Sequence, residues 1–355
     1  MRNRQRFLLY SSIGVFAFLG AQLAGAAQSA PQMTAAANAF IATLNEEQRD
    51  SVVQPMLNDE RTVWSNLPIS MVRPDGLLIG DMNDDQKSAL QGLLRASMSS
   101  QGYAKASGIM RLDDLLYDIE SEKFKDDPRR LAFAQISNSG NYAVAVFGSP
   151  GEDDWGWKLA GHHLAVNFTV SDGRVGFTPM FVGSSPATIE SGPYAGWMVL
   201  PQEASRGIEF MQSLTGTQQK AAKIHDVVAD HIFEGPGRRA SLTKFEGLKT
   251  DELSVAQMRL LRALIVEYVG NADFDSADAQ MNLIDQTGWD ELWFSWRGAV
   301  DLHGEFYFRV HGPRLLIEYN RQNPNHDHSV MRDPLNDYGE DWLEHHYKEY
   351  HRTVN

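Results

Sequence analysis

Helix starts can be recognised at four places in this sequence, and the four places form two pairs. Each segment puts Asn, Thr or Ser three residues before Gln, with an apolar residue in front. This pattern is the capping box, in which the two side chains satisfy backbone N–H groups at the start of a helix. The boxes occupy 44–48 and 82–86 in one pair, and 214–218 and 253–257 in the other. The length of chain between the two boxes is nearly the same in both pairs.

Strand-like runs follow each pair of boxes and can be aligned with each other. The first half has runs at 142–147 and 157–168, and the second has runs at 292–296 and 308–319. In this alignment Gly161 matches Gly312, and Asn167 matches Glu318. We therefore predict an α+β fold made of an internally duplicated unit, a helix pair plus antiparallel strands, with a mixed or antiparallel sheet flanked by helices. A chance coincidence of common capping boxes and strands is the alternative.

The N-terminus has the pattern of a secretory signal peptide. Arg2, Arg4 and Arg6 precede the apolar run 7–23, which ends in small residues at 24–26. This pattern predicts cleavage near Ala26 and a periplasmic or secreted protein, with an uncleaved membrane anchor as the alternative. We expect a single duplicated domain over 27–355, with 27–205 as its first half and 206–355 as its second.

The charge of the chain limits its partners. Its formal net charge is −14, and loss of the three arginines in 1–26 would make it −17. Such a field repels nucleic acid and anionic lipid, so we expect a small-molecule substrate or ligand, no nucleic acid, and no membrane association after cleavage. The chain has no cysteine. A metal site would therefore use His, Asp, Glu or Asn.

Histidines gather at two places that the duplication would bring together. His326 and His328 stand in the polar, turn-rich run 322–334, directly after the apolar run 315–319. His162 and His163 are adjacent in the matching part of the first half. Two histidines at i and i+2 of an extended loop can point the same way, and neutral imidazole suits Zn, Cu and Fe. We predict a divalent transition metal, most simply Zn, with Cu or Fe possible, held by these four residues: His163, His326, His328 and His162. A surface-polar H-x-H without metal is the alternative.

Strand alternation adds residues around this predicted site. It places His163, Asn167 and Glu318 on equivalent polar faces, which converge if the matched strands are neighbours. Glu318 would be a fourth ligand or the general base, and Arg332 would stabilise a developing anion.

Residues outside that face complete the prediction. Asp333 would orient a ligand imidazole, and Glu60 and Arg61 would line the site. The alternative is that these three residues have no role in a site. Asp333-Pro334 would then simply end the loop, and Glu60 and Arg61 would form ion pairs on a solvated surface.

Several ordered motifs together resemble a bacterial family called domain of unknown function 3500. The motifs are Glu60-Arg61-x-x-Trp64, Gly102-Tyr103-x-Lys105, Trp155-Gly156-Trp157, Gly161-His162-His163-Leu164, Ser191-Gly192-Pro193, and Leu316-Ile317-Glu318-Tyr319 through Arg332-Asp333-Pro334. The resemblance covers nearly the whole mature chain and implies a single module. It supplies no reaction. Pro324-Asn325 departs from the family's pattern, which puts the turn at that point in doubt but not the histidines.

Two functions remain open from the sequence. The first is an exported metal-dependent enzyme, most simply a hydrolase that uses a His/Glu-bound metal and an activated water. The second is a periplasmic metal- or small-ligand-binding protein without catalysis, with Trp155, Trp157, Trp293 and Trp296 lining its pocket. Imidazole nitrogens within about 3–4 Å of one another would support a metal site, because ligand bonds are about 2 Å long.

Overall fold

The computed structural model describes residues 29–134 and 136–350. The predicted signal peptide, 1–26, lies outside the described residues. No helix in the described part of the chain combines the length and apolar character needed to cross a membrane. The helices are α1 (Ser29–Ala42), α2 (Glu46–Val52), α3 (Asp84–Ser97), α4 (Ser100–Lys123), α5 (Pro128–Ala134), α6 (Pro201–Ser213), α7 (Gly216–Ala222), α8 (Val255–Val269), α9 (Phe274–Thr287) and α10 (Glu340–Tyr350).

The strands form one 13-stranded mixed sheet, which with the helices confirms the α+β class. The longest path through it is β1-β3-β4-β5-β7-β13-β12-β11-β10-β8. The strands are β1 (Val53–Gln54), β2 (Leu77–Leu78), β3 (Ala143–Gly148), β4 (Asp154–Gly161), β5 (Leu164–Ser171), β6 (Arg174–Gly176), β7 (Met180–Ser184), β8 (Lys223–His225), β9 (Leu248–Lys249), β10 (Trp293–Gly298), β11 (Phe306–Gly312), β12 (Leu315–Asn323) and β13 (His326–Arg332).

The strand order reads the same from either edge of the sheet. Each edge begins with a short strand, β1 or β8, that runs parallel to its neighbour, β3 or β10. A short antiparallel strand, β2 or β9, also pairs with that neighbour. An antiparallel run then leads to the centre, where β7 pairs with β13. This order supports the internal duplication, which stays a prediction. The predicted boundary at 205/206 falls inside α6.

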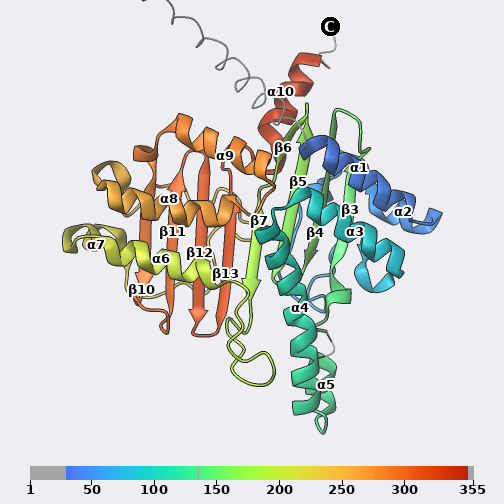
Figure 1. Ribbon diagram of the computed structural model, residues 1–355, viewed down its shortest axis with the longest axis horizontal. Coiled ribbons are helices and arrows are strands. Elements are labelled where there is room, and N and C mark those ends of the chain that lie inside the picture. The colour runs from blue at the N-terminus through green and yellow to red at the C-terminus, as the bar shows by residue number, and fades with distance from the viewer. Residues whose placement is uncertain (1–28, 135, 351–355) are drawn as a thin grey trace, which may run out of the picture.

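The two faces of the sheet are covered differently. Helices α1, α3 and α4 lie over the first half of one face, and α6, α8 and α9 lie over the second half (Figure 1). The main core fills the space under these helices. Loops cover the opposite face, where a smaller apolar cluster forms. Its principal members are Trp64, Phe181, Ile232, Val330 and Tyr338.

All four predicted capping boxes are present, and they explain the repeated spacing. Asn45 and Asn83 start α2 and α3, while Thr215 and Ser254 start α7 and α8. In the first half the two box glutamines bond to each other, Gln86 Nε2 donating to Gln48 Oε1 at 2.7 Å. In the second half Gln257 Nε2 donates to Gln218 Oε1 at 2.8 Å. In each half, the chain between the two boxes therefore brings the second helix start back into contact with the first.

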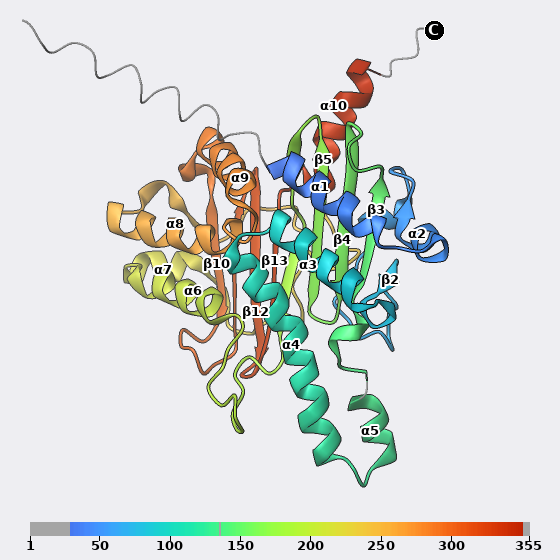
Figure 2. The ribbon, with the colours of Figure 1, turned by 45° about the vertical axis from the view of Figure 1, so that its right-hand side comes forward.

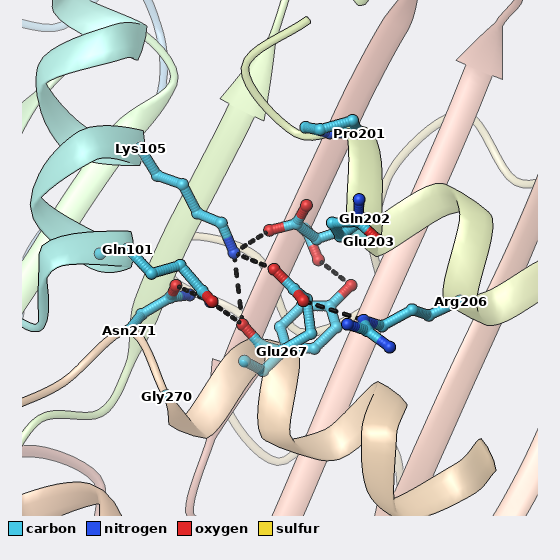
Figure 3. A network of polar contacts seen from close by, with 12 residues as sticks. Gln101, Lys105, Pro201, Gln202, Glu203, Arg206, Glu267, Gly270 and Asn271 are labelled. Atoms are coloured by element: carbon cyan, nitrogen blue, oxygen red, sulfur yellow. Dashed lines mark hydrogen bonds and ion pairs between the residues drawn. The ribbon is translucent and has the colours of Figure 1, made fainter. Parts of the chain in front are cut away.

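A buried ionic network joins the helices of the two halves (Figure 3). Lys105 of α4 lies 2.7 Å from carboxylate oxygens of both Glu203 of α6 and Glu267 of α8. Arg206 is 2.9 Å from the other oxygen of Glu267. Gly102 permits this approach, because a Cβ there would lie 2.0 Å from Asn271 O. The Gly102-Tyr103-x-Lys105 motif thus belongs to the joint between the halves.

The expectation that the matched strands are neighbours is wrong. The pair β5 and β12 is separated by β7 and β13, which occupy the centre of the sheet. The face assignment itself holds: Leu164 and Ile317 lie in the main core, and Glu318 points away from it. Two intervening strands, about 4.8 Å apart each, keep residues of β5 and β12 from meeting.

Candidate metal centre

The turn-rich segment of the sequence is a β-hairpin rather than a loop. Strands β12 and β13 flank a turn at Pro324-Asn325, and His326 and His328 belong to β13. Side chains alternate along a strand, so both imidazoles point to the same face. Asp327 between them points to the other face, where Arg321 holds its carboxylate with two hydrogen bonds at 2.7 and 2.8 Å.

His163 reaches this pair from the turn that joins β4 and β5. Its backbone has φ of +62°, a left-handed conformation uncommon for residues other than glycine. Two backbone bonds hold it there. His163 N donates to Asn66 O at 3.1 Å, and Gly183 N donates to His163 O at 2.7 Å. The loop over the sheet and the central strand β7 thus both position this imidazole.

Three imidazoles meet in one group. A ring nitrogen from each of His163, His326 and His328 lies within 4.8 Å of the other two. His163 Nε2 is 2.9 Å from His326 Nε2, so one ring donates its N–H to the other. Tetrahedral zinc with bonds near 2 Å places its ligand nitrogens about 3.3 Å apart. Small side-chain rotations would therefore let a cation replace the shared proton.

Gly183 provides the space for the group. A Cβ on this residue would lie 2.9 Å from His163 Cδ2 and 3.1 Å from His328 Cδ2. It would also lie 3.0 Å from Asp327 O. Two imidazoles therefore pack directly over a backbone that carries no side chain. The sequence signal was a glycine inside a strand, which often marks such a close approach.

The imidazoles face a cavity of about 450 Å³ on the loop-covered side of the sheet. Its walls come from the loop before β2, from the loop after β8 and from the end of β12. The residues that line it besides the three imidazoles include Asn66, Pro68, His162, His231, Arg238 and Gln322. Phe181 lies beneath the group, with its ring centre 5.5 Å from that of His328.

The environment keeps these imidazoles neutral. Burial lowers the pKa of His163 well below its usual value of 6.5, with the neighbouring imidazoles contributing. Burial also lowers the pKa of His326, and lowers the pKa of His328 to about 3. A neutral imidazole keeps a lone pair for a metal. His328 Nε2 is buried and has no hydrogen-bond partner among the described residues, although a buried nitrogen without one is costly.

Gln322 is close enough to fix the orientation of His326. Its side-chain nitrogen lies 3.1 Å from His326 Nδ1, while its oxygen is buried without a partner in the described part of the chain. Exchanging the nitrogen and oxygen of this amide by a half-turn would let the oxygen accept a proton from Nδ1. That arrangement leaves Nε2 free to bind a metal, as second partners of ligand histidines commonly do.

His162 lies beside the group but outside it. Its ring stacks on that of His163 with centres 3.9 Å apart, yet it does not belong to the set of three converging nitrogens. Asp113 of α4 holds His162 Nδ1 at 2.9 Å, and Tyr142 donates to the second oxygen of Asp113 at 2.7 Å. The structure therefore makes His162 a carboxylate-oriented imidazole at the cavity wall rather than a fourth ligand.

Glu318 is not brought to the cavity. Its carboxylate accepts hydrogen bonds from Phe233 N, Glu234 N and Tyr307 Oη at 2.7–2.8 Å. Burial raises its pKa, and these hydrogen bonds oppose that rise. Glu318 thus anchors the loop over the sheet and is fully occupied there. Glu318 was expected to be a fourth ligand or the general base because β5 and β12 were expected to be neighbours. In the sheet, β7 and β13 lie between these two strands.

Arg332 and Asp333 are also engaged elsewhere. Arg332 pairs with Asp337 at 2.6 Å and donates to Glu234 O at 2.9 Å. Asp333 is held by Arg314 at 2.7 Å. Neither lines the cavity. Arg332 stands four residues beyond His328 on β13, about 13 Å along the strand, so it cannot reach the imidazoles.

The remaining predicted residues lie in other contacts. Asn167 donates to Pro179 O at 2.8 Å. Glu60 O accepts from Lys158 at 2.6 Å, and Arg61 donates to Tyr338 O at 2.7 Å. None of the three lines the cavity. The tryptophans expected around a pocket do not line it either, and three of them are core residues: Trp155, Trp157 and Trp296.

A family model described as "Protein of unknown function (DUF3500)" matches residues 26–340. The chain belongs to this family. The match confirms the resemblance in the motifs and covers the imidazoles, their cavity and the joint between the halves of this DUF3500 protein. No curated protein and no solved structure matches the chain.

Sequence patterns alone missed several residues of the candidate site. Asp113 and Tyr142 lie far from the histidines along the chain, and neither stands in a recognisable motif. Gln322 was part of the polar run but was assigned no role. Only Gly183 carried a signal, a glycine within the apolar segment that becomes β7.

Proposed function

We propose that this DUF3500 protein binds one divalent transition-metal ion through His163, His326 and His328, and hydrolyses a small substrate with it after export. The observation that carries the proposal is the convergence of three neutral imidazole nitrogens within 4.8 Å at the wall of a cavity. Zn²⁺ is the simplest choice, and the same donors suit Cu²⁺ and Fe²⁺.

The donor set favours an enzyme over a storage or structural site. Structural zinc sites are closed by four protein ligands, whereas catalytic sites keep one position for water. Three protein ligands and an adjoining cavity match the second type. The metal, when bound, would lower the pKa of its water toward neutrality.

His162 is the group best placed to take the proton from that water. Its Nδ1 is held by Asp113 at 2.9 Å, which leaves Nε2 as the acceptor at the cavity wall. A carboxylate that orients an imidazole in this way fixes which ring nitrogen accepts the proton. His162 thus takes the role of general base that was first expected of Glu318.

Metal analysis of the purified protein tests the binding step. We expect about one Zn²⁺ per chain after growth with supplemented metal, and loss of that metal in the His326→Ala/His328→Ala double variant. His225→Ala/His303→Ala is a matched control, because it removes two exposed histidines outside the cavity. Absence of stoichiometric Zn, Cu and Fe from the folded wild-type protein would end the proposal.

Hydrolysis assays test the catalytic step. A panel of activated carboxylic and phosphate esters should show turnover that disappears with chelator and returns with added metal. His162→Gln should keep the metal and lose about a hundred-fold or more of the rate, the usual contribution of a general base. Metal binding without turnover of any ester would instead support the non-catalytic binding protein.

A further inference from the structure

A second cavity meets the first at the imidazoles. It has a volume of about 640 Å³ and is lined by α4 and by the loop after β7. Four residues line both cavities: Pro68, His162, His163 and His326. Two of the three proposed ligands therefore stand at the boundary between two spaces. A substrate over the metal could extend into both.

The first cavity is lined by basic residues, although the chain as a whole is acidic. The chain carries 46 acidic and 32 basic residues, yet among the described residues no Asp or Glu lines this cavity. Arg238 and His231 do line it. The Arg238 guanidinium donates to Ile232 O at 2.7 Å, and no carboxylate in the described ranges forms an ion pair with it. A guanidinium without a carboxylate partner, next to a cation site, favours an anionic group.

The second cavity has aliphatic side chains on part of its wall. Leu116 and Ile119 of α4 line it together with Ile136 and Ile189, and the charged residues Glu120, Lys123 and Glu190 also line it. Ile119 is 48% exposed. This part of α4 extends beyond the end of the sheet, as Figure 2 shows, so the core does not cover it. An aliphatic group of a ligand would cover these side chains.

We infer that the substrate is an ester or amide with an anionic group on one side of the scissile carbonyl and an aliphatic group on the other. This inference rests on the proposed hydrolytic function. The anionic group lies near Arg238, the aliphatic group lies in the second cavity, and the carbonyl lies over the imidazoles. Water adds to the carbonyl carbon, the C–N or C–O bond breaks, and the leaving amine or alcohol takes a proton. The products are one carboxylic acid and one amine or alcohol.

Calorimetric titration with N-acylglycines tests the inference. The probes are N-acetylglycine, N-butanoylglycine and N-octanoylglycine, together with the uncharged N-octanoylglycinamide. Affinity should rise about three- to four-fold per methylene group until the cavity is filled, as expected for burial of CH₂ groups. The uncharged amide should bind at least ten-fold more weakly than the acid of the same chain length.

Variants assign the two effects to the two cavities. Arg238→Gln should abolish the preference for the acid and keep the dependence on chain length. Ile119→Asn should weaken the dependence on chain length and keep the preference for the acid. Arg129→Gln is the matched control, because Arg129 is exposed and lines neither cavity.

The same titrations on metal-free and metal-loaded protein separate this inference from the proposed function. Failure to load metal defeats the proposed function, while the metal-free titration still reports on both cavities. Equal binding of acid and amide, no dependence on chain length, or no binding of any probe would overturn the inference.

Discussion

At the scale of single residues, the imidazole group depends on the absence of a side chain at Gly183. Gly183 lies under His163 and His328, and any larger residue would place its Cβ about 3 Å from both rings. The histidines themselves could be predicted from their adjacency in the sequence. The space between them could not, because it depends on how β7 pairs with β13 and with the turn before β5.

Gly183→Ala should lower metal affinity while the fold persists. The added methyl group would push His163 and His328 apart by some tenths of an ångström, and ligand geometry tolerates little displacement. We expect a loss of ten-fold or more in Zn²⁺ affinity, measured by competition with a chromophoric chelator. Gly92→Ala, at a helix position with open space around it, should bind Zn²⁺ as wild type does. Unchanged affinity in Gly183→Ala would mean that the rings are not held over this residue.

Carboxylates were the weakest part of the residue-level prediction. Glu318 was placed at the site by strand alternation in the matched strands, and Asp333 by its position in the same polar run as the histidines. Both instead accept hydrogen bonds from buried donors. Glu318 accepts from Phe233 N, Glu234 N and the Tyr307 hydroxyl, and Asp333 accepts from Arg314. A buried carboxylate needs such donors wherever it lies, so polarity near a histidine does not by itself indicate a shared site.

At the scale of elements, helix starts were the most predictable feature of the chain. A capping box is local, since its two side chains and two backbone groups belong to neighbouring positions of one helix turn. The bond between the two box glutamines was not predictable, because it joins two helices that are distant in the chain. The segment 322–334 was misread as a loop because its polar residues hid the alternation of a strand that is buried on both sides.

Gln86→Ala should destabilise the protein by about 1–3 kcal/mol, through loss of a cap and of buried hydrogen bonds. Gln86 accepts from Asn83 N and donates to both Gln48 and Thr43 O, so its removal leaves several groups unpaired. Denaturant unfolding measures the effect. Gln202→Ala, at an exposed position of α6, should change stability by less than about 0.5 kcal/mol. Similar unfolding midpoints for both variants would contradict the structural role of the paired boxes.

At the scale of the whole molecule, the two halves are joined by one continuous sheet and by the ionic network under the helices. Lys105 is its centre, with Glu203 and Glu267 on two different helices of the other half. Burial raises the pKa of Glu203, and the nearby lysine opposes that rise. A cation in this position stabilises the joint chiefly by preventing two carboxylates from being buried without a partner.

Lys105→Met should cost about 3–5 kcal/mol, because it leaves Glu203 buried without its cation. The Lys105→Met/Glu203→Met double variant should recover part of that loss, since Glu267 keeps Arg206. Thermal or denaturant unfolding compares the two with Lys220→Met, which removes an exposed lysine. A double variant less stable than Lys105→Met would refute this account of the network.

The metal-free protein should lose stability as the pH falls below about 6.5. The unfolded chain binds a proton at each imidazole there, whereas burial holds the pKa of His163 and of His328 far lower and keeps both neutral. The unfolded state therefore gains protons first, and stability falls with acidification. With a folded pKa of about 3, His328 alone accounts for about 2 kcal/mol between pH 7.5 and 5. The His326→Ala/His328→Ala variant should show a shallower dependence in denaturant unfolding at each pH.

The sequence by itself determined the local features: the capping boxes, the apolar strands, the adjacent histidines and the family to which the chain belongs. These depend on residues that are near one another in the chain, where side-chain chemistry and periodicity act directly. Tertiary structure alone decided which polar residues share a cavity. Insertion of β7 and β13 at the centre of the sheet separated Glu318 from His163 and brought Gly183 beneath the imidazoles. Glu318 lies on the strand next to β13, but its carboxylate is held by Phe233 N, Glu234 N and Tyr307. That outcome depends on the pairing of two strands from opposite halves of the chain, for which no local pattern exists.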